Sequence, residues 1–181
     1  NLRQPRLAAV LAAAAEAFGW GAQPTAPARG AGADPGANRG VGLACGADKG
    51  SYVAACVEVE VERATGRPQV LRVVQAFDCG AVINPDHVRS QVEGAIIQGL
   101  GGALFERVEF ANGRILNPDF GGYRVPRFAD TPAIETILLD RKDVEPAGAG
   151  ETPIVAIAPA IANALFAATG VRRRGLPLQP A

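Results

Sequence analysis

The chain has 181 residues, 48% of them hydrophobic and 20% charged, and its 18 basic residues balance 18 acidic ones. This composition predicts a packed globular core and excludes an intrinsically disordered chain. A formal net charge of zero provides no electrostatic basis for a nucleic-acid partner or for binding to an anionic membrane surface.

The first 39 residues are predicted to form a helix followed by a linker. Apolar residues at helical spacing favour a helix over residues 5–18, which Gly19 and Gly21 then end. Residues 19–39 are rich in Gly, Ala and Pro and lack periodicity, as is typical of a loop. We therefore divide the chain into an N-terminal helix with its linker, residues 1–39, and a C-terminal domain, residues 40–181.

Three strands are predicted next. Residues 41–47 are apolar, and residues 52–61 end in Val57-Glu58-Val59-Glu60-Val61, whose alternation indicates a half-buried strand. Turn residues 64–67 separate this strand from residues 69–77. We expect the latter to pair back as the second arm of a hairpin.

Residues 86–104 have apolar side chains at four-residue spacing, which predicts a helix. Gly94, Gly99, Gly101 and Gly102 interrupt it, and each glycine costs a helix about 1 kcal/mol relative to alanine. Such a run suggests that something large packs against the helix backbone.

Shorter elements complete the pattern. Strands are predicted over Leu104–Phe110, over Arg114–Leu116 after an Asn112-Gly113 turn, and over Ile134–Leu139. A closing helix is predicted over Pro153–Thr169, with Gly170 after it. Because strands and helices mix without strict βαβ alternation, the fold class is α+β, with mixed sheet layers packed against helices.

Several kinds of site and segment are excluded. The spacing of Cys45, Cys56 and Cys79 matches no zinc or iron–sulfur motif, so these residues are predicted to be small buried hydrophobes. His87 lies three residues from Ser90, but no acid is placed to orient it, and a surface or capping role is expected. The apolar segments 7–18 and 154–169 are interrupted by charged, proline or amide residues, so neither predicts a transmembrane segment.

The heptapeptide Gly148-Ala149-Gly150-Glu151-Thr152-Pro153-Ile154 places one carboxylate between a glycine-rich loop and the closing helix. Thr152 is a candidate N-cap, and Pro153 suits a first helical position. Glycines allow the backbone to pass close to a bulky ligand, and Glu151 could then act as a general base. The alternative is that Glu151 simply complements the helix dipole.

Three blocks of sequence together carry a family resemblance. They are Asp78-Cys79-Gly80-Ala81-Val82-Ile83-Asn84-Pro85 with Gln91-Val92-Glu93-Gly94-Ala95-Ile96-Ile97-Gln98-Gly99-Leu100-Gly101, then Tyr123-Arg124-Val125-Pro126-Arg127-Phe128-Ala129-Asp130-Thr131-Pro132, then Gly148-Ala149-Gly150-Glu151 with Pro159-Ala160-Ile161-Ala162-Asn163-Ala164. From about Gly40 onward, the chain resembles the C-terminal part of the large, molybdenum-binding subunit of molybdenum hydroxylases. That family includes xanthine dehydrogenases, aldehyde oxidoreductases and isoquinoline 1-oxidoreductases.

The resemblance implies a molybdopterin-binding domain and gives roles to particular residues. Glu151 matches the family's catalytic glutamate, which acts as a base. Gln91 matches a glutamine that hydrogen-bonds molybdopterin, and Gly148 and Gly150 fall in the loop next to the cofactor. No protein side chain is implied as a metal ligand.

The implied activity is oxidation of an N-heterocycle or an aldehyde by hydroxylation with water-derived oxygen. The implied cofactors are molybdopterin, for which a cytosine dinucleotide is one form, and 2Fe-2S clusters on a partner subunit. The implied partners are the rest of the molybdenum subunit, a small 2Fe-2S subunit, an FAD subunit or a cytochrome, and a small-molecule substrate. The compartment stays open.

The sequence contains no methionine, which indicates a processed chain or a piece of a longer protein. The family's large subunit is several times longer, so we expect the isolated chain to be catalytically inactive. An alternative from another class is a non-catalytic module that keeps the fold for interaction or assembly.

Overall fold

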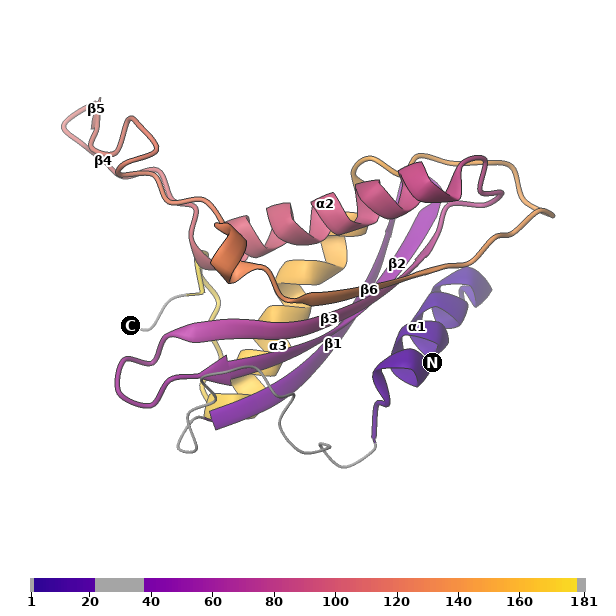
Figure 1. Ribbon diagram of the computed structural model, residues 1–181, viewed down its shortest axis with the longest axis horizontal. Helices are drawn as coiled ribbons and strands as arrows, with labels where there is room; N and C mark the ends of the chain where they lie inside the picture. Colours follow the sequence, from indigo (N-terminus) through magenta and orange to yellow (C-terminus); the bar gives the residue numbers. More distant parts are fainter. Residues whose placement is uncertain (1, 22–37, 179–181) are drawn as a thin grey trace.

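The computed structural model describes residues 2–21 and 38–178 as helices on both faces of a mixed sheet (Figure 1). The helices are α1 (Pro5–Phe18), α2 (Pro85–Leu104) and α3 (Ile157–Thr169), with 3-10 helices η1 (Phe128–Asp130) and η2 (Thr152–Ala156). The strands are β1 (Asn38–Asp48), β2 (Ser51–Val61), β3 (Pro68–Asp78), β4 (Phe110–Ala111), β5 (Arg114–Ile115) and β6 (Ala133–Leu138). The main sheet has the order β1-β2-β3-β6, with β6 parallel to β3 and the other pairs antiparallel. This architecture confirms the predicted α+β class.

The central strand β2 is buried on both faces over much of its length. Val53, Ala55 and Val57 pack with α2 and α3 in the larger core, whereas Ala54 and Cys56 pack with α1 on the opposite face. Alternate side chains of a strand point to opposite faces, so one strand serves both cores. Farther along β2, Glu58 and Glu60 replace the apolar residues of the α1 face and form ion pairs with Arg39 of β1.

Helix α3 lies directly on β1 because β1 offers glycines where the two backbones meet. A Cβ at Gly42 would overlap the carbonyl oxygen of Ala160 and the amide nitrogen of Ala164, and one at Gly40 would overlap the carbonyl oxygen of Ala164. The buried side chains Ile157, Ile161 and Leu165 complete this contact with the sheet.

The turn from β3 into α2 has a structural role. The Asn84 side chain accepts a hydrogen bond from the His87 amide at 3.0 Å and caps α2, and Pro85 takes the first helical position. Asp78 is fully buried and accepts hydrogen bonds from the Arg6 guanidinium at 2.6 and 2.9 Å. Helix α1 is thereby joined to the end of β3.

The cysteines behave largely as the sequence predicted. Cys56 and Cys79 are buried and Cys45 is half-buried, and all three are free thiols. Burial raises the pKa of the Cys56 thiol to about 12, so this side chain is a neutral thiol at physiological pH.

Two predicted elements need correction. Leu104–Phe110 is not a strand: Leu104 is the last residue of α2, and only Phe110–Ala111 pairs with Arg114–Ile115. The helix predicted over Pro153–Thr169 is divided into the 3-10 helix η2 and α3, which begins at Ile157. The predicted linker falls mostly on residues 22–37, which lie outside the described residues, and the domain boundary at residues 39 and 40 stays a prediction.

Candidate functional site

The loop that carries Glu151 is tied to the end of the sheet by hydrogen bonds on both sides of the carboxylate. Before it, the Ser51 hydroxyl donates to the Gly148 carbonyl at 2.7 Å. After it, the Thr152 hydroxyl donates to the Asp48 carbonyl at 2.9 Å, and the buried Gln75 amide donates to the Pro153 carbonyl at 2.9 Å. Three contacts within a few residues fix the backbone from which the Glu151 side chain projects.

Glu151 itself points outward from this fixed backbone. Its side chain is 70% exposed and forms an ion pair with Lys49, which is 62% exposed at the β1–β2 turn. Exposed pairs of this kind contribute roughly 0–1 kcal/mol, so Lys49 does not lock the carboxylate in place. Glu151 is therefore free to exchange this contact for one with a ligand.

The predicted capping arrangement at this helix start was wrong. Glu151, and not Thr152, is the N-cap of η2, and its side chain makes no capping hydrogen bond. Thr152 is instead buried, with its hydroxyl turned to the β1–β2 hairpin. Because η2 leads directly into α3, a favourable interaction of the Glu151 carboxylate with the helix dipole stays the alternative interpretation.

Gly148 and Gly150 are exposed, and nothing in the described part of the chain requires glycine at either position. A Cβ at either residue would meet no atom within 4 Å, and neither residue has a left-handed φ angle. Space beside these two residues is therefore open to a group from outside the chain.

Gln91 lies on the exposed face of α2. It shares this face with Gly94, Gln98 and Gly102, which follow at helical spacing, and Gln91, Gly94 and Gln98 are all exposed. A Cβ at Gly94 or Gly102 would meet no atom within 4 Å. Within the described residues the Gln91 amide has no hydrogen-bond partner, so its donors and acceptor are available to a ligand.

The two predicted site residues do not touch each other, but their elements do. Helix α2 packs on η2 and α3 at Gly99, where a Cβ would meet Ile157 at 2.8 Å and Ile154 at 3.1 Å. Gly99 lies about 80° around the helix axis from Gln91 and roughly 12 Å along it. Element η2 therefore contacts α2 on a side of the helix about 80° from Gln91.

The run of glycines in α2 thus has two uses. Gly99 accommodates Ile157, and Gly101 accommodates the Glu106 carboxylate, so these two serve packing inside the chain. Gly94 and Gly102 face open space instead. Close packing of a large group against the helix backbone is thus seen at Gly99 and Gly101, and for Gly94 and Gly102 it stays a prediction.

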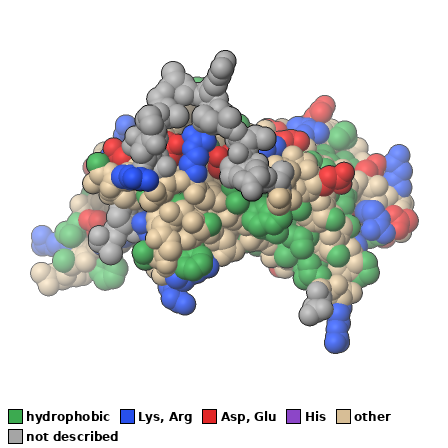
Figure 2. Space-filling view, turned by 90° about the horizontal axis from the view of Figure 1, so that it is seen from below, with side chains coloured by type: hydrophobic (Ala, Val, Ile, Leu, Met, Phe, Trp, Pro, Cys, Tyr) green, Lys and Arg blue, Asp and Glu red, His purple; other side chains and the backbone are tan. Residues whose placement is uncertain are grey.

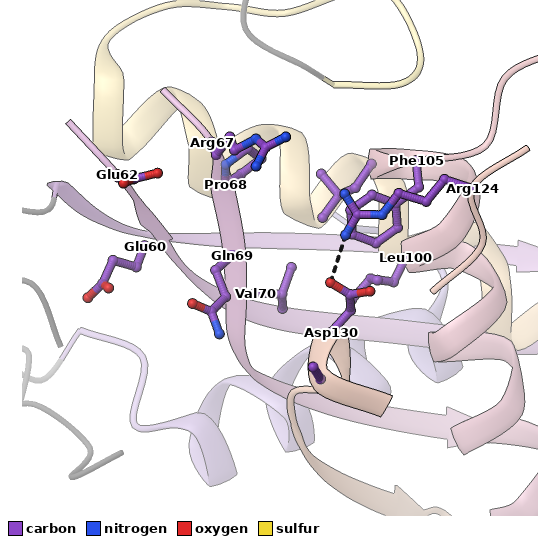
Figure 3. A pocket seen from close by; sticks show the side chains of 12 residues that line it. Glu60, Glu62, Arg67, Pro68, Gln69, Val70, Leu100, Phe105, Arg124 and Asp130 are labelled. Carbon is purple, nitrogen blue, oxygen red and sulfur yellow. Dashed lines mark hydrogen bonds and ion pairs between the residues drawn. The ribbon is translucent and has the colours of Figure 1, made fainter. Parts of the chain in front are cut away.

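A hollow in the described surface lies elsewhere. It has a volume of about 590 Å³ and lies between the end of β2, the start of β3 and the C-terminal end of α2, with Glu62, Val70, Leu100 and Arg124 in its lining (Figure 3). Since Lys49 and Glu151 are near the opposite end of β2, the strand's eleven residues, at ~3.3 Å each, separate this hollow from the carboxylate. Neither predicted site residue contacts it.

The face shown in Figure 2 has no charge of a single sign across it. On the face shown in Figure 2, basic and acidic side chains lie side by side, and apolar side chains gather between them. Ser90 donates its hydroxyl hydrogen to the Asp86 carbonyl at 3.0 Å, not to the exposed His87. Among the described residues Thr152–Thr169 is long and apolar enough to cross a membrane, but 44% of it is buried, as in a core helix, and α3 packs on β1.

Sequence reasoning missed the residues that hold the Glu151 loop. Ser51, Gln75 and Thr152 were not singled out for this purpose. Gln75 was detectable, because it is a polar residue inside the apolar run Val73–Phe77, and a buried amide needs a partner. Ser51 and Thr152 gave no such signal, since small hydroxyl residues are common in turns.

Comparison with known proteins identifies the fold. Residues 47–132 match the molybdopterin cofactor-binding domain. Over these residues the chain belongs to the molybdopterin cofactor-binding domain family. The resemblance to molybdenum-binding subunits that the sequence blocks carried is thereby confirmed.

Three members of the family show the extent of the match. Isoquinoline 1-oxidoreductase subunit beta of Brevundimonas diminuta is 38% identical over 98% of this chain and 22% of its own length. The aldehyde oxidoreductase molybdenum-binding subunit of Escherichia coli K12 is 41% identical over 67% of this chain and 18% of its own length. The crystal structure of quinoline 2-oxidoreductase from Pseudomonas putida 86 superposes with a TM-score of 0.66 at 26% identity, covering 71% of this chain and 17% of that one. The chain thus spans about a fifth of these relatives.

The side chains present fit one side of a molybdopterin site. The described residues contain no group of three or more His, Cys, Asp or Glu side chains that could hold a metal ion. The Gln91 amide and the open backbone at Gly94, Gly148 and Gly150 instead suit hydrogen bonding and close approach to an organic cofactor.

Proposed function

We propose that this chain forms one side of the active site of a molybdenum hydroxylase, with Glu151 as the general base. The observation that supports this most is the geometry of the Glu151 loop. Its backbone is held by Ser51, Gln75 and Thr152, while the carboxylate and two neighbouring glycines face open space. A preorganised backbone with an accessible carboxylate is what proton abstraction in an active site requires.

The proposal assigns the protein's part in the reaction to four residues. When bound, molybdopterin supplies the two-electron oxidation chemistry and the activation of water-derived oxygen. The Gln91 amide would hold the pterin by hydrogen bonds, and the open backbone at Gly148 and Gly150 would allow it to approach closely. A Glu151 carboxylate oxygen, once it leaves Lys49, would accept the proton from the water-derived oxygen. General-base catalysis of this kind accelerates a reaction by about 10²–10⁴-fold.

The substrate class we propose is an N-heterocycle or an aldehyde. The family members named above include proteins named for isoquinoline, quinoline and aldehyde, which share an electron-poor carbon next to nitrogen or oxygen. We further propose that electrons leave through 2Fe-2S clusters of a partner subunit, and that the cofactor is a cytosine dinucleotide form.

The proposal makes a prediction for the 181-residue chain alone. Because it offers one side of the cofactor site, the chain should retain no molybdenum and show no turnover. Metal analysis of the purified chain, with and without the rest of the subunit, measures this. Stoichiometric molybdenum in the chain alone would contradict the one-sided site.

The decisive substitution is Glu151→Gln in the complete enzyme. Glutamine has nearly the same shape and the loop keeps its three backbone contacts, so molybdenum content and fold should be unchanged. An amide does not accept the proton at neutral pH, so kcat should fall at least 100-fold, or about 2.7 kcal/mol in barrier height. Both kcat and molybdenum are measured on the same preparation.

The matched control is Glu145→Gln, which changes an exposed glutamate six residues earlier in the same loop. It should leave kcat and metal content at wild-type levels. A Glu151→Gln enzyme with full metal and more than a tenth of wild-type kcat would show that Glu151 is not the base.

A further inference from the structure

Residues 106–127 form an arm that projects from the body of the protein at the C-terminal end of α2, with β4 and β5 at its tip (Figure 1). No residue of this arm is buried. It nevertheless displays large apolar side chains, of which Phe110 is 75% exposed and Phe120 is 78% exposed. The exposed large hydrophobics from the arm and from η1 at its base are Val108, Phe110, Ile115, Leu116, Phe120 and Phe128.

The backbone of the arm is held in place by polar contacts rather than by a core. The Asn117 side chain donates to the Arg107 carbonyl at 2.7 Å and accepts from the Glu109 amide at 2.8 Å. Asp119 accepts from the amides of Gly121 and Gly122 at 2.9 and 3.2 Å. These hydrogen bonds fix the backbone conformation of the arm, although its apolar side chains remain exposed.

The two ends of the arm, at Glu106 and Pro126, form its root and contact α2. A Cβ at Gly101 would overlap the flexible end of the Glu106 side chain and lie 3.0 Å from Pro126, so both ends of the arm lie close to the helix backbone at this glycine. The Tyr123 hydroxyl, at 3.3 Å from Glu106, and the Arg124–Asp130 ion pair at 3.0 Å link the returning segment to the same root. The arm is therefore directed by α2 and is not a loose loop.

We propose that this arm docks into the part of the molybdenum-binding subunit that lies outside the present sequence. This inference rests on the proposed function, because it takes the chain as part of such a subunit. The isoquinoline 1-oxidoreductase subunit aligns with 98% of this chain over only 22% of its own length, so most of that polypeptide remains to cover surface left open here. A run of exposed apolar side chains on an ordered, otherwise coreless hairpin is typical of an interface that another part of the protein buries.

A second copy of this chain and a separate small subunit are less suitable occupants. A segment of the same polypeptide is present at high effective concentration and needs no separate association step. The preordered backbone further lowers the entropy cost of burying Phe110 and Phe120.

Amide hydrogen exchange tests the docking without any substitution. Amides of residues 106–120 should exchange at least ten-fold more slowly in the complete subunit than in the 181-residue chain. Equal exchange rates in both would overturn the proposal. The measurement is independent of turnover and metal content. Slow exchange in the arm would support docking even if Glu151 proved not to be the base, and fast exchange would overturn docking even if Glu151 proved to be the base.

Cross-linking identifies the occupant. A photoreactive benzoyl-phenylalanine at Phe120 of the complete subunit should form its cross-links with peptides of the same polypeptide from outside this sequence. Cross-links to a second copy of this chain or to another subunit would overturn the proposal.

A pair of variants at one position separates docking from local structure. Phe110→Ser should speed arm exchange in the complete subunit at least ten-fold, whereas Phe110→Leu, which stays apolar, should keep most of the protection. Neither variant should change the thermal midpoint of the 181-residue chain, because Phe110 is exposed there. Equal protection in both complete-subunit variants would show that Phe110 is not part of the interface.

Discussion

At the scale of single residues, Asp78 is the clearest case of a side chain whose surroundings decide its role. Burial by itself would raise the pKa of its carboxyl, but hydrogen bonds from Arg6 and from the Gly80 amide outweigh that effect and hold the pKa below its usual 3.8. Arg6 is in turn mostly buried between α1 and the sheet. The ionised form of Asp78 is therefore the one that the folded state favours.

This shift has a definite sign for stability. A group whose pKa is lower in the folded state contributes stability that is fully present above the unfolded pKa, about 3.9, and is lost as the pH falls through the folded pKa. Asp78→Asn should lower the free energy of unfolding at pH 7 by roughly 1.5–3 kcal/mol, the value of hydrogen bonds to charged groups. Urea unfolding from pH 7 down to pH 3 measures the difference from wild type, which should stay constant to about pH 4 and shrink below it.

The control is Asp143→Asn, which removes the carboxylate of an exposed pair with Arg141. This substitution should cost much less at pH 7 because water solvates both partners. A loss from Asp78→Asn that did not depend on pH would show that charge is not what stabilises this contact.

Residue-level prediction from sequence succeeded in placing Glu151 where a glycine-rich loop enters a helix, and Cys56 and Cys79 as small buried residues. It failed for Thr152, because a threonine hydroxyl after a loop can cap its own helix or bond a distant carbonyl, and only the tertiary structure selects between them. The roles of Glu151, Gln91, Gly148 and Gly150 toward a cofactor stay predictions.

At the scale of elements, the space beside each glycine shows whether another element packs against it or whether its surface is open. Gly42 in β1 meets the backbone of α3, whereas Gly94 in α2 meets nothing. Both are glycines in regular secondary structure. They differ in whether another element packs against the glycine backbone.

Alanine at these two positions should therefore act in opposite directions. Gly42→Ala places a methyl group against the backbone of Ala160 and Ala164, which has no flexible end to move away, so it should destabilise the chain by about 1–3 kcal/mol or more. Gly94→Ala should be neutral or stabilise α2 by up to ~1 kcal/mol. Chemical denaturation of the two variants beside wild type measures both changes. A stable Gly42→Ala protein would mean that α3 does not sit directly on β1.

Periodicity alone predicted most elements, including α1, the β2–β3 hairpin and α2. It failed where backbone chemistry overrides the pattern. Pro159 has no amide hydrogen for an α-helical bond to Val155, so α3 begins at Ile157, with the proline in its first turn, and a 3-10 helix precedes it. Residues 105–110 mix three charged with three apolar side chains, and of these residues only Phe110 belongs to a strand in the described structure.

At the scale of the whole molecule, the sheet separates two regions. The loop that carries Glu151 lies at the end of the sheet where β1 turns into β2, and the arm projects from the end where α2 finishes (Figure 1). Helix α2 runs between these regions and keeps the face of Gln91, Gly94 and Gln98 exposed along its length. A partner held at the arm would therefore approach along the same helix that presents Gln91.

Because Gln91 is exposed, its substitution should lower cofactor retention without changing the stability of the fold. Within the described residues its amide has no partner, so Gln91→Ala should leave the unfolding free energy of the 181-residue chain within about 0.5 kcal/mol of wild type. In the complete enzyme the same substitution removes a hydrogen bond to the pterin, worth ~1 kcal/mol or more when the partner is left unpaired. A loss of about 1.4 kcal/mol would weaken cofactor binding ten-fold, and it would be seen as a lower pterin and molybdenum content after dialysis. The control is Gln98→Ala, seven residues later on the same exposed face. Equal losses of pterin from both variants would indicate a general effect of altering this face. Unchanged pterin content in Gln91→Ala would show that Gln91 is not part of the cofactor site.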